Sequence, residues 1–213
     1  MYKDLMREVC AELSQLPVEE RIDALNECRT MLHEVSPLKS QPVDCVLWVP
    51  AEEVEANEYN PNKVAPPEMR LLYDSIRQDG YTMPDVTYLD NETGKRDIVD
   101  GFHRRQIQLD HPDISALVYG RLPVTTIHKP LAERMASTIR HNRARGAHDV
   151  DLMSNIVREL HDLGRSDAWI AKHLGMDADE ILRLKQITGL AALFTDGTFS
   201  RAWVPGGVTN GEK

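Results

Sequence analysis

The stretch 98–106, Ile-Val-Asp-Gly-Phe-His-Arg-Arg-Gln, constrains the fold most, because it joins the end of an expected strand to the start of an expected helix. Backbone N–H groups at a helix start favour an anion. Gly101 permits a close approach of a ligand to the backbone, and the guanidinium of Arg104 can bind two phosphate oxygens. The stretch therefore predicts a phosphate or carboxylate site. The alternative is an Asp-Gly turn before a surface helix with solvated arginines.

The acidic charge of the chain is concentrated at its N-terminal end. The chain has 213 residues and a net charge of −9. Residues 1–60 hold 13 acidic and 5 basic residues, a balance of −8, so the remaining 153 residues stand at −9 minus −8, or −1. The segment 121–145 is basic, with Glu133 as its one acidic residue. The net charge therefore does not exclude an anionic partner.

Composition argues against a secreted or membrane protein. The three cysteines, Cys10, Cys28 and Cys45, have neither the number nor the spacing of a disulfide framework or a zinc site. No apolar run is long enough to span a bilayer, and the N-terminus has no signal-peptide core. With 28% charged residues and a mean hydropathy of −0.42, we expect a cytoplasmic protein without a membrane partner.

Hydrophobic periodicity and turn residues divide the chain into four parts. The predicted parts are an acidic helical hairpin with a linker (1–42), an α/β domain (43–130), a helical region (131–190) and a tail (191–213). In the α/β domain we predict strands at 43–49, 86–89, 97–99 and 122–127 and helices at 68–78 and 102–109. The hairpin is expected to pack on the domain or on a second copy of the chain.

The last helices predict a helix-turn-helix. A capped helix begins at Ser166, a turn follows around Gly175, and a second helix is expected over 177–188. If this second helix entered the major groove of DNA, its contacts would be Arg183, Lys185 and Gln186. The alternative is a helical hairpin that only packs, because acidic residues at the start of the second helix would repel phosphates.

Four short motifs in this order resemble the N-terminal domain of the ParB family, over about residues 44–190. They are the loop 57–62, the strand entry 80–84, Gly-Phe-His-Arg at 101–104, and His-Asn-Arg-Ala-Arg at 141–145. The form Asp-Gly-Phe-His-Arg is similar to that of serine kinases of this fold and of IbrB-like prophage co-activators. The resemblance implies an α+β chain: a small ParB/sulfiredoxin-like mixed-sheet domain, then a helical domain with the helix-turn-helix.

The resemblance also implies a nucleotide site, because partition proteins of this family hold CTP and magnesium with the last two motifs. Carried over, Gly101 and Arg104 would meet phosphates. The other residues implied at the site are Phe102, His103, Arg105, His141, Asn142 and Arg145. His141 stands where the family has a Glu near the metal, and magnesium prefers oxygen ligands. Either Asn142 and phosphate hold the metal, or the nucleotide is used differently.

Enzyme activity is left open by the resemblance. Sulfiredoxin needs a cysteine just before His-Arg, and Phe102 stands there, so sulfinate reduction is excluded. A kinase of this fold needs an acidic base from the first loop, for which Glu58 is the candidate. Hydrolysis of a nucleotide triphosphate is a further expectation.

The function that these features predict is a DNA-binding transcriptional or partition-type regulator with a nucleotide pocket. The expected ligands are DNA and CTP, or another nucleotide, with Mg²⁺, and a homodimer is expected as well. The alternatives are a small-molecule kinase or nuclease of the same fold, and a protein-interaction module that works through the acidic hairpin.

Overall fold

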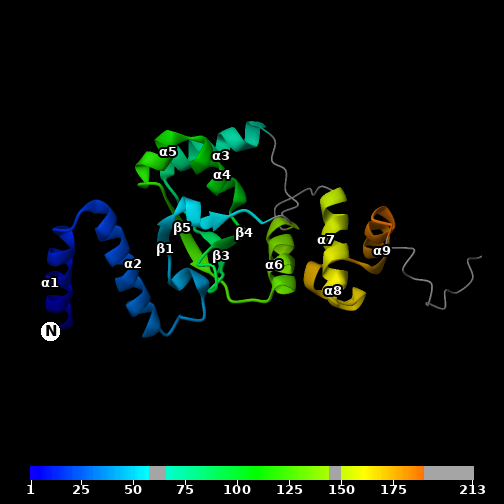
Figure 1. Cartoon of the computed structure of the whole chain (residues 1–213), viewed down its shortest axis with the longest axis horizontal. Helices are drawn as coiled ribbons and strands as arrows, with labels where there is room; N and C mark the ends of the chain where they lie inside the picture. The colour runs from blue at the N-terminus through cyan, green and yellow to red at the C-terminus, as the bar shows by residue number, and fades with distance from the viewer. Residues whose placement is uncertain (58–65, 144–149, 190–213) are drawn as a thin grey trace, which may run out of the picture.

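The computed structural model describes residues 1–57, 66–143 and 150–189. Figure 1 shows a helical hairpin (α1 and α2) at one end, a sheet with helices in the middle, and the helices α7 to α9 at the other end. The strands are β1 (Leu47–Pro50), β2 (Val54–Glu55), β3 (Asp85–Leu89), β4 (Arg96–Asp100) and β5 (Arg121–Thr126). The α-helices are α1 (Tyr2–Ser14), α2 (Val18–Glu34), α3 (Pro66–Asp79), α4 (Phe102–Asp110), α5 (Pro112–Leu117), α6 (Leu131–Arg143), α7 (Val150–Asp162), α8 (Asp167–Leu174) and α9 (Ala178–Ile187).

The sheet is mixed, as predicted. Its strand order is β1-β5-β3-β4-β2. The pairs β1–β5 and β3–β4 are antiparallel, and the pairs β3–β5 and β2–β4 are parallel. This arrangement, followed by the helical region, confirms the predicted α+β class.

The sequence prediction differs from the structure at three short elements. The strand predicted at 43–49 begins only at Leu47, because Pro42–Asp44 forms a 3₁₀ turn, η1. The carboxylate of Asp44 holds this turn, since it accepts a hydrogen bond from Ser36 and contacts the ring of His33. The two-residue strand β2 and the short helix α5 were not predicted. Both are too short to show a hydrophobic period.

The hairpin is attached to the edge of the sheet by polar contacts. The side chain of Asn26 donates to the carbonyl of Trp48 (2.7 Å) and accepts from its N–H (3.0 Å). Arg121 of β5 pairs with Asp23 at 2.5 Å. These contacts cover the backbone of β1, which is an edge strand. No residue of α1 or α2 is buried, so the hairpin adds little to the core.

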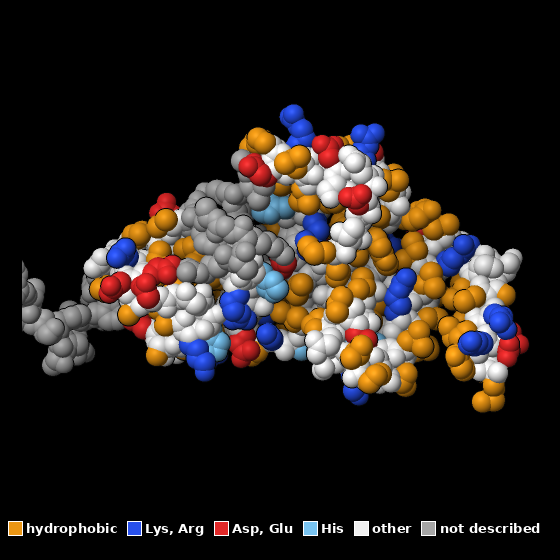
Figure 2. Space-filling model, turned by 180° about the vertical axis from the view of Figure 1, so that it is seen from behind, with side chains coloured by type: hydrophobic (Ala, Val, Ile, Leu, Met, Phe, Trp, Pro, Cys, Tyr) orange, Lys and Arg blue, Asp and Glu red, His pale blue; other side chains and the backbone are white. Residues whose placement is uncertain are grey.

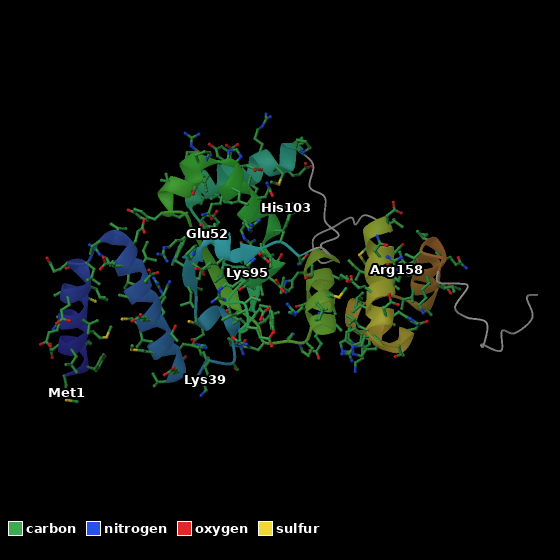
Figure 3. The ribbon with its side chains drawn as sticks, in the orientation of Figure 1. Met1, Lys39, Glu52, Lys95, His103 and Arg158 are labelled. Atoms are coloured by element: carbon green, nitrogen blue, oxygen red, sulfur yellow. The ribbon has the colours of Figure 1, made fainter. Side chains whose placement is uncertain are left out.

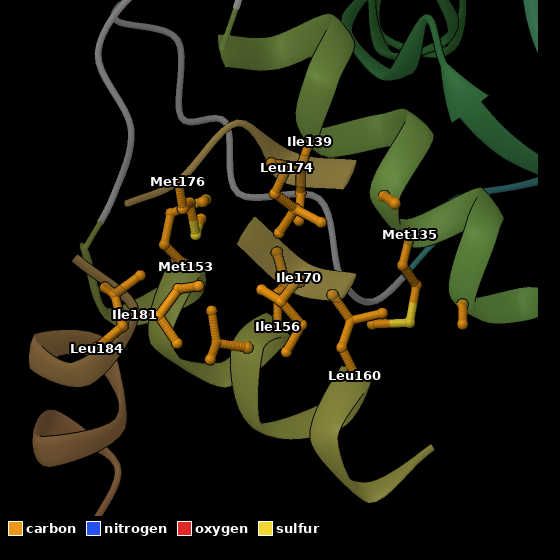
Figure 4. Close-up of a cluster of buried hydrophobic side chains, with 13 residues drawn as sticks. Met135, Ile139, Met153, Ile156, Leu160, Ile170, Leu174, Met176, Ile181 and Leu184 are labelled. Atoms are coloured by element: carbon orange, nitrogen blue, oxygen red, sulfur yellow. The ribbon is translucent and has the colours of Figure 1, made fainter. Parts of the chain in front are cut away.

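Helix α6 links the sheet to the helical core. Ala132, Met135, Ala136 and Ile139 of α6 are buried together with apolar residues of α7, α8 and α9. Figure 4 shows this core, in which Met135 and Ile139 of α6 face Ile156, Leu160 and Ile170. A second core of six buried residues lies within the sheet. The helix-turn-helix is therefore fixed to the α/β part through α6.

The described helices include none that is long and apolar enough to cross a membrane.

Candidate functional site

The predicted phosphate site lies where β4 ends and α4 begins, and Gly101 determines its backbone. Gly101 is the N-cap of α4 and has φ of +118°, a conformation that other residues rarely adopt. The position is also crowded. A Cβ atom at Gly101 would lie 2.2 Å from Oδ1 of Asp85. Both the left-handed backbone and this close approach therefore require glycine.

Arg104 is engaged by Asp85. Its Nε donates to Oδ1 of Asp85 at 2.6 Å, and its Nη2 donates to the carbonyl of Pro84 at 3.1 Å. Asp85 is fully buried, and the side chain of Arg104 is 12% exposed. Burial raises the pKa of Asp85 to about 7, against the opposing effect of Arg104. The guanidinium predicted to bind phosphate thus neutralises a buried carboxylate of β3 first.

Arg105 is a freer cation at the start of α4. Its Nε is buried and has no hydrogen-bond partner in the described part of the chain. Phe102 packs on the sheet core, and its ring meets that of His103 edge to face at 5.2 Å. Burial lowers the pKa of His103, and the charge of Arg104 adds to the effect. At neutral pH, His103 is therefore a neutral imidazole, and Arg105 is the side chain with unused donors. Figure 3 marks His103 on α4.

Helix α6 is fastened along β4, which brings His141 to the same place. Arg134 pairs with Asp97 at 2.7 Å, and the hydroxyl of Thr138 donates to the carbonyl of Val99 at 2.8 Å. One turn further, Nδ1 of His141 lies 4.0 Å from Oδ2 of Asp100, the residue before Gly101. The structure therefore brings together two stretches that are separated by about forty residues in the sequence.

Three of the predicted site residues lie outside what the structure describes. Glu58 and Arg145 are outside the described residues, and of Asn142 only the backbone, at the end of α6, is described. Among the described residues, no three His, Cys, Asp or Glu side chains gather as they would to hold a metal ion. The orphaned Nε of Arg105 fits a phosphate oxygen. The described side chains thus fit phosphate better than magnesium.

The helix-turn-helix has a cap at each helix start. Ser166 accepts a hydrogen bond from the N–H of Trp169, and Asp177 accepts one from the N–H of Glu180. Gly175 ends α8 with φ of +68°. The turn between α8 and α9 is therefore fixed by Gly175, which the sequence predicted, and by the cap at Asp177, which it did not predict.

The three predicted DNA contacts on α9 are placed differently from one another. Arg183 and Gln186 are exposed and share one face of α9. Lys185 is only 1% exposed, and its ammonium pairs with Asp167 at the start of α8. This position corrects the expectation for Lys185: its side chain holds α8 and α9 together inside the motif and leaves no ammonium at the surface of α9.

A cationic surface on α8 was missed by the sequence analysis. The rings of Trp169 and His173 stack at 4.0 Å, and the guanidinium of Arg165 lies 5.0 Å from the ring of Trp169. Arg140 of α6 donates to the carbonyl of His173 at 2.9 Å. Lys172 is exposed on the same helix. Figure 2 shows Lys and Arg side chains close together on the helical part of the molecule. The four-residue spacing of Arg165, Trp169 and His173 was the available signal.

Three solved structures are similar to this chain at low sequence identity. The C-terminally truncated chromosome-partitioning protein ParB from Caulobacter crescentus, complexed with CTP-γ-S, has 17% identity and a TM-score of 0.40, covering 71% of this chain and 87% of that one. The same protein complexed to the centromeric parS site has 15% identity and a TM-score of 0.44, covering 72% and 79%. A Pnob8-like ParB-N domain has 13% identity and a TM-score of 0.41, covering 68% and 61%.

Two sequence similarities show the family of the chain. The family model described as the IbrB-like C-terminal HTH domain matches residues 148–196, which include α7, α8 and α9. The protein named "Uncharacterized protein YbdM" of Escherichia coli (strain K12) is 50% identical over 203 residues, which are 95% of this chain and 97% of that protein. The chain therefore belongs to the family of YbdM, and its C-terminal part, residues 148–196, matches the IbrB-like helix-turn-helix domain.

Proposed function

We propose that this protein is a DNA-binding regulator that reads DNA with its helix-turn-helix and binds a phosphate ligand where β4 meets α4. The observation that carries the DNA part is the doubly capped helix-turn-helix of α8 and α9, within the IbrB-like match. We also propose that the protein acts in transcription or in partition, and that it works in the cytoplasm. Its chain would be divided into the four parts predicted from the sequence.

The exposed groups of the motif suit DNA in two ways. On α9, Arg183 and Gln186 offer donors to base edges, and these residue types pair with guanine and adenine in the major groove. Lys172 lies on α8, the first helix of the motif, and Arg165 lies just before its N-cap. In proteins of this type, the first helix crosses the phosphate backbone. Asp179 precedes Arg183 by one turn on the same face and weakens non-specific binding to phosphates.

The test is enrichment of duplexes from a random DNA library by the full chain, followed by anisotropy titrations of the enriched duplex at several salt concentrations. We expect binding that weakens with salt, with a log–log slope of about 0.9 per phosphate contact. Arg183→Ala with Gln186→Ala should abolish the sequence preference. Arg70→Ala, an exposed arginine on α3, is the matched control. No enrichment of any sequence by the wild type would contradict the proposal.

For the phosphate ligand, we propose a nucleotide, CTP first, held by the start of α4. Gly101 begins α4 with its left-handed backbone, and Arg105 offers the unused donor. Phe102, His103 and Arg104 shape the site, His141 and Asn142 close it from α6, and Arg145 completes it. Mg²⁺, when bound with the nucleotide, would neutralise phosphate charge, and Asn142 is the proposed oxygen ligand from the protein.

Thermal-shift and calorimetric titrations with CTP and ATP, with and without Mg²⁺, test this ligand. We expect CTP to raise the melting temperature of the wild type and to have a much smaller effect on Arg105→Gln. Arg70→Gln should respond as the wild type does. Equal responses of all three proteins to CTP would remove Arg105 from the site.

The described residues support two alternative functions to different degrees. A kinase or nuclease with Glu58 as base, or hydrolysis of the nucleotide, has no described side chain in its favour. Asp85 has a raised pKa, as catalytic acids often do, but it is fully buried against Arg104. An interaction module is favoured by one observation: the apolar face of α1 is exposed, with Leu5 60% and Met6 42% accessible. A second copy of the chain is its proposed partner.

A further inference from the structure

A cavity lies away from the predicted nucleotide site, between the end of the hairpin and the connection from β5 to α6. Its volume is about 360 Å³, a size that suits a small molecule. Figure 3 shows Lys39 below α2 and His103 on α4, on opposite sides of the sheet. No residue of the cavity lining belongs to the site at Gly101 or to the helix-turn-helix.

The lining carries positive charge from two separate segments. Lys39 comes from the linker after α2, and Lys129 comes from the residues just before α6. His33 and His128 stand beside them in the same two segments. Within the described residues, neither lysine has an ion-pair partner, and the lining includes no Asp or Glu. Two lysines without an acidic partner, in a chain of net charge −9, give this cavity a positive charge that favours an anionic ligand.

The wall around these cations is held in place by the 3₁₀ turn η1. Nδ1 of His33 lies 2.6 Å from Oδ2 of Asp44, and Ser36 donates to Oδ1 of Asp44 at 3.0 Å. Asp44, an acid beside the lining, has both carboxylate oxygens engaged by these two contacts. On the other side, the N–H of Ile127 donates to the carbonyl of Thr87 at 2.8 Å, which fixes the chain before Lys129. The cavity is therefore bounded by anchored backbone.

One part of the lining is apolar. Pro42, Leu47 and Ile127 line the cavity beside the basic residues. An anionic group near the lysines could thus be accompanied by an apolar or flat body against these three side chains. The cavity is too small for a protein segment, and the helix-turn-helix lies at the opposite end of the molecule from α2 (Figure 1). These features favour a small ligand over duplex DNA.

We propose that this cavity binds a small phosphorylated molecule, with Lys39 and Lys129 on its phosphate group and Pro42, Leu47 and Ile127 against its body. Lysine ammonium groups bind phosphate as point charges, and the two lysines come from two separate segments of the lining. Because Lys129 leads directly into α6, the ligand would connect the linker after the hairpin to the helix that carries the helix-turn-helix core.

Cys45 provides a built-in reporter, since it lines the cavity and is half-buried, while Cys10 on α1 is exposed. The full chain is alkylated with iodoacetamide in pyrophosphate, and in chloride of equal ionic strength, and the extent at each cysteine is measured by mass spectrometry. We expect pyrophosphate to slow alkylation of Cys45 several-fold and to leave Cys10 unchanged. Arg105→Gln should keep this protection, which separates the cavity from the predicted nucleotide site.

The decisive variants are matched in charge. Lys39→Gln with Lys129→Gln should lose the protection of Cys45, whereas Lys3→Gln with Lys172→Gln, two exposed lysines elsewhere, should keep it. Equal alkylation of Cys45 in pyrophosphate and chloride would overturn the proposal. Protection that survives in Lys39→Gln with Lys129→Gln, or that is lost equally in the control pair, would overturn it too, because the effect would then come from overall charge.

Discussion

Arg104 and Asp85 form a buried ion pair, with Nε and Oδ1 2.6 Å apart, directly beneath the glycine that starts α4. The pair joins the first turn of α4 to β3. It makes Arg104 part of the architecture of the predicted phosphate site, whether or not the guanidinium also reaches a ligand. Loss of ligand binding on mutation of Arg104 would therefore not by itself identify a contact.

Arg104→Ala should destabilise the fold. Above pH 7, where Asp85 is ionised, removing Arg104 leaves a buried carboxylate uncompensated, at a cost of about 3–5 kcal/mol. Arg105→Ala, next along α4, should cost much less, because Arg105 has no described ion-pair partner. Urea unfolding of the two variants measures the difference. Equal and small losses in both would mean that Asp85 does not depend on Arg104.

Gly101→Ala should be more damaging than an ordinary glycine substitution. The new Cβ would lie 2.2 Å from Oδ1 and 2.4 Å from Cγ of Asp85, and φ is +118°. The matched control is Gly94→Ala, which also has positive φ (+74°) but no atom within 4 Å of the new Cβ. Backbone strain of this kind costs about 1–3 kcal/mol, so any loss at Gly101 beyond that at Gly94 reports the clash. Equal melting temperatures would show that Asp85 moves aside freely.

Asp85 should make stability depend on pH in a specific direction. Its pKa is raised from 3.8 to about 7 by burial. Between these values the folded state holds a proton that the unfolded state has released, so this group's contribution to stability is present at low pH and is lost as pH rises toward 7. Asp85→Asn should remove this dependence, while Asp97→Asn, a more exposed residue of β4, should retain it. Unfolding free energies between pH 4 and pH 8 test this, and an unchanged slope in Asp85→Asn would contradict it.

The sequence predicted most of the long elements, because their hydrophobic periods and end signals are local. Helices α3, α4 and α9 were placed within two residues of their ends, and the turn at Gly175 was recognised from glycine after an apolar helix. Gly101 could be identified for the same reason. The backbone at an Asp-Gly pair is decided by the residues themselves.

The partner of Arg104 could not be predicted in this way. Asp85 is 19 residues away, and the two meet only because β3 pairs with β4 and α4 packs on that pair. Lys185 is a different case. It lies four residues after Ile181, which puts it on the inward face of α9, so its burial could have been inferred from spacing. Lysine is a typical DNA contact, and for that reason the sequence analysis predicted an exposed side chain at this position.

Self-association should run through α1, if the expected homodimer forms. Leu5 is 60% exposed on a helix with no buried residue, so Leu5→Glu should shift the protein to monomer in sedimentation experiments. Leu71→Glu, at a leucine of α3 that is 69% exposed, is the matched control.

A wild type that stays monomeric at all concentrations, or a dimer that Leu5→Glu and Leu71→Glu affect equally, would remove α1 as the interface.

Lys185 and Arg183 should separate the stability of the helix-turn-helix from its binding of DNA. Lys185 is buried against Asp167, so Lys185→Ala removes a packed side chain as well as an ion pair, and losses of about 2–5 kcal/mol are usual for large buried side chains cut to alanine. Lys185→Met keeps most of the volume and should recover much of that loss. Arg183→Ala, at an exposed position, should change stability by less than about 0.5 kcal/mol.

The two positions should have the opposite ranking for DNA affinity. Lys185→Met should bind the enriched duplex nearly as the wild type does, and Arg183→Ala should not. Chemical denaturation followed by anisotropy on the same preparations gives both quantities. If Lys185→Met folds normally and still loses DNA, the lysine leaves its buried pair to contact the duplex, and the assignment of Lys185 as an internal residue of the motif is incorrect.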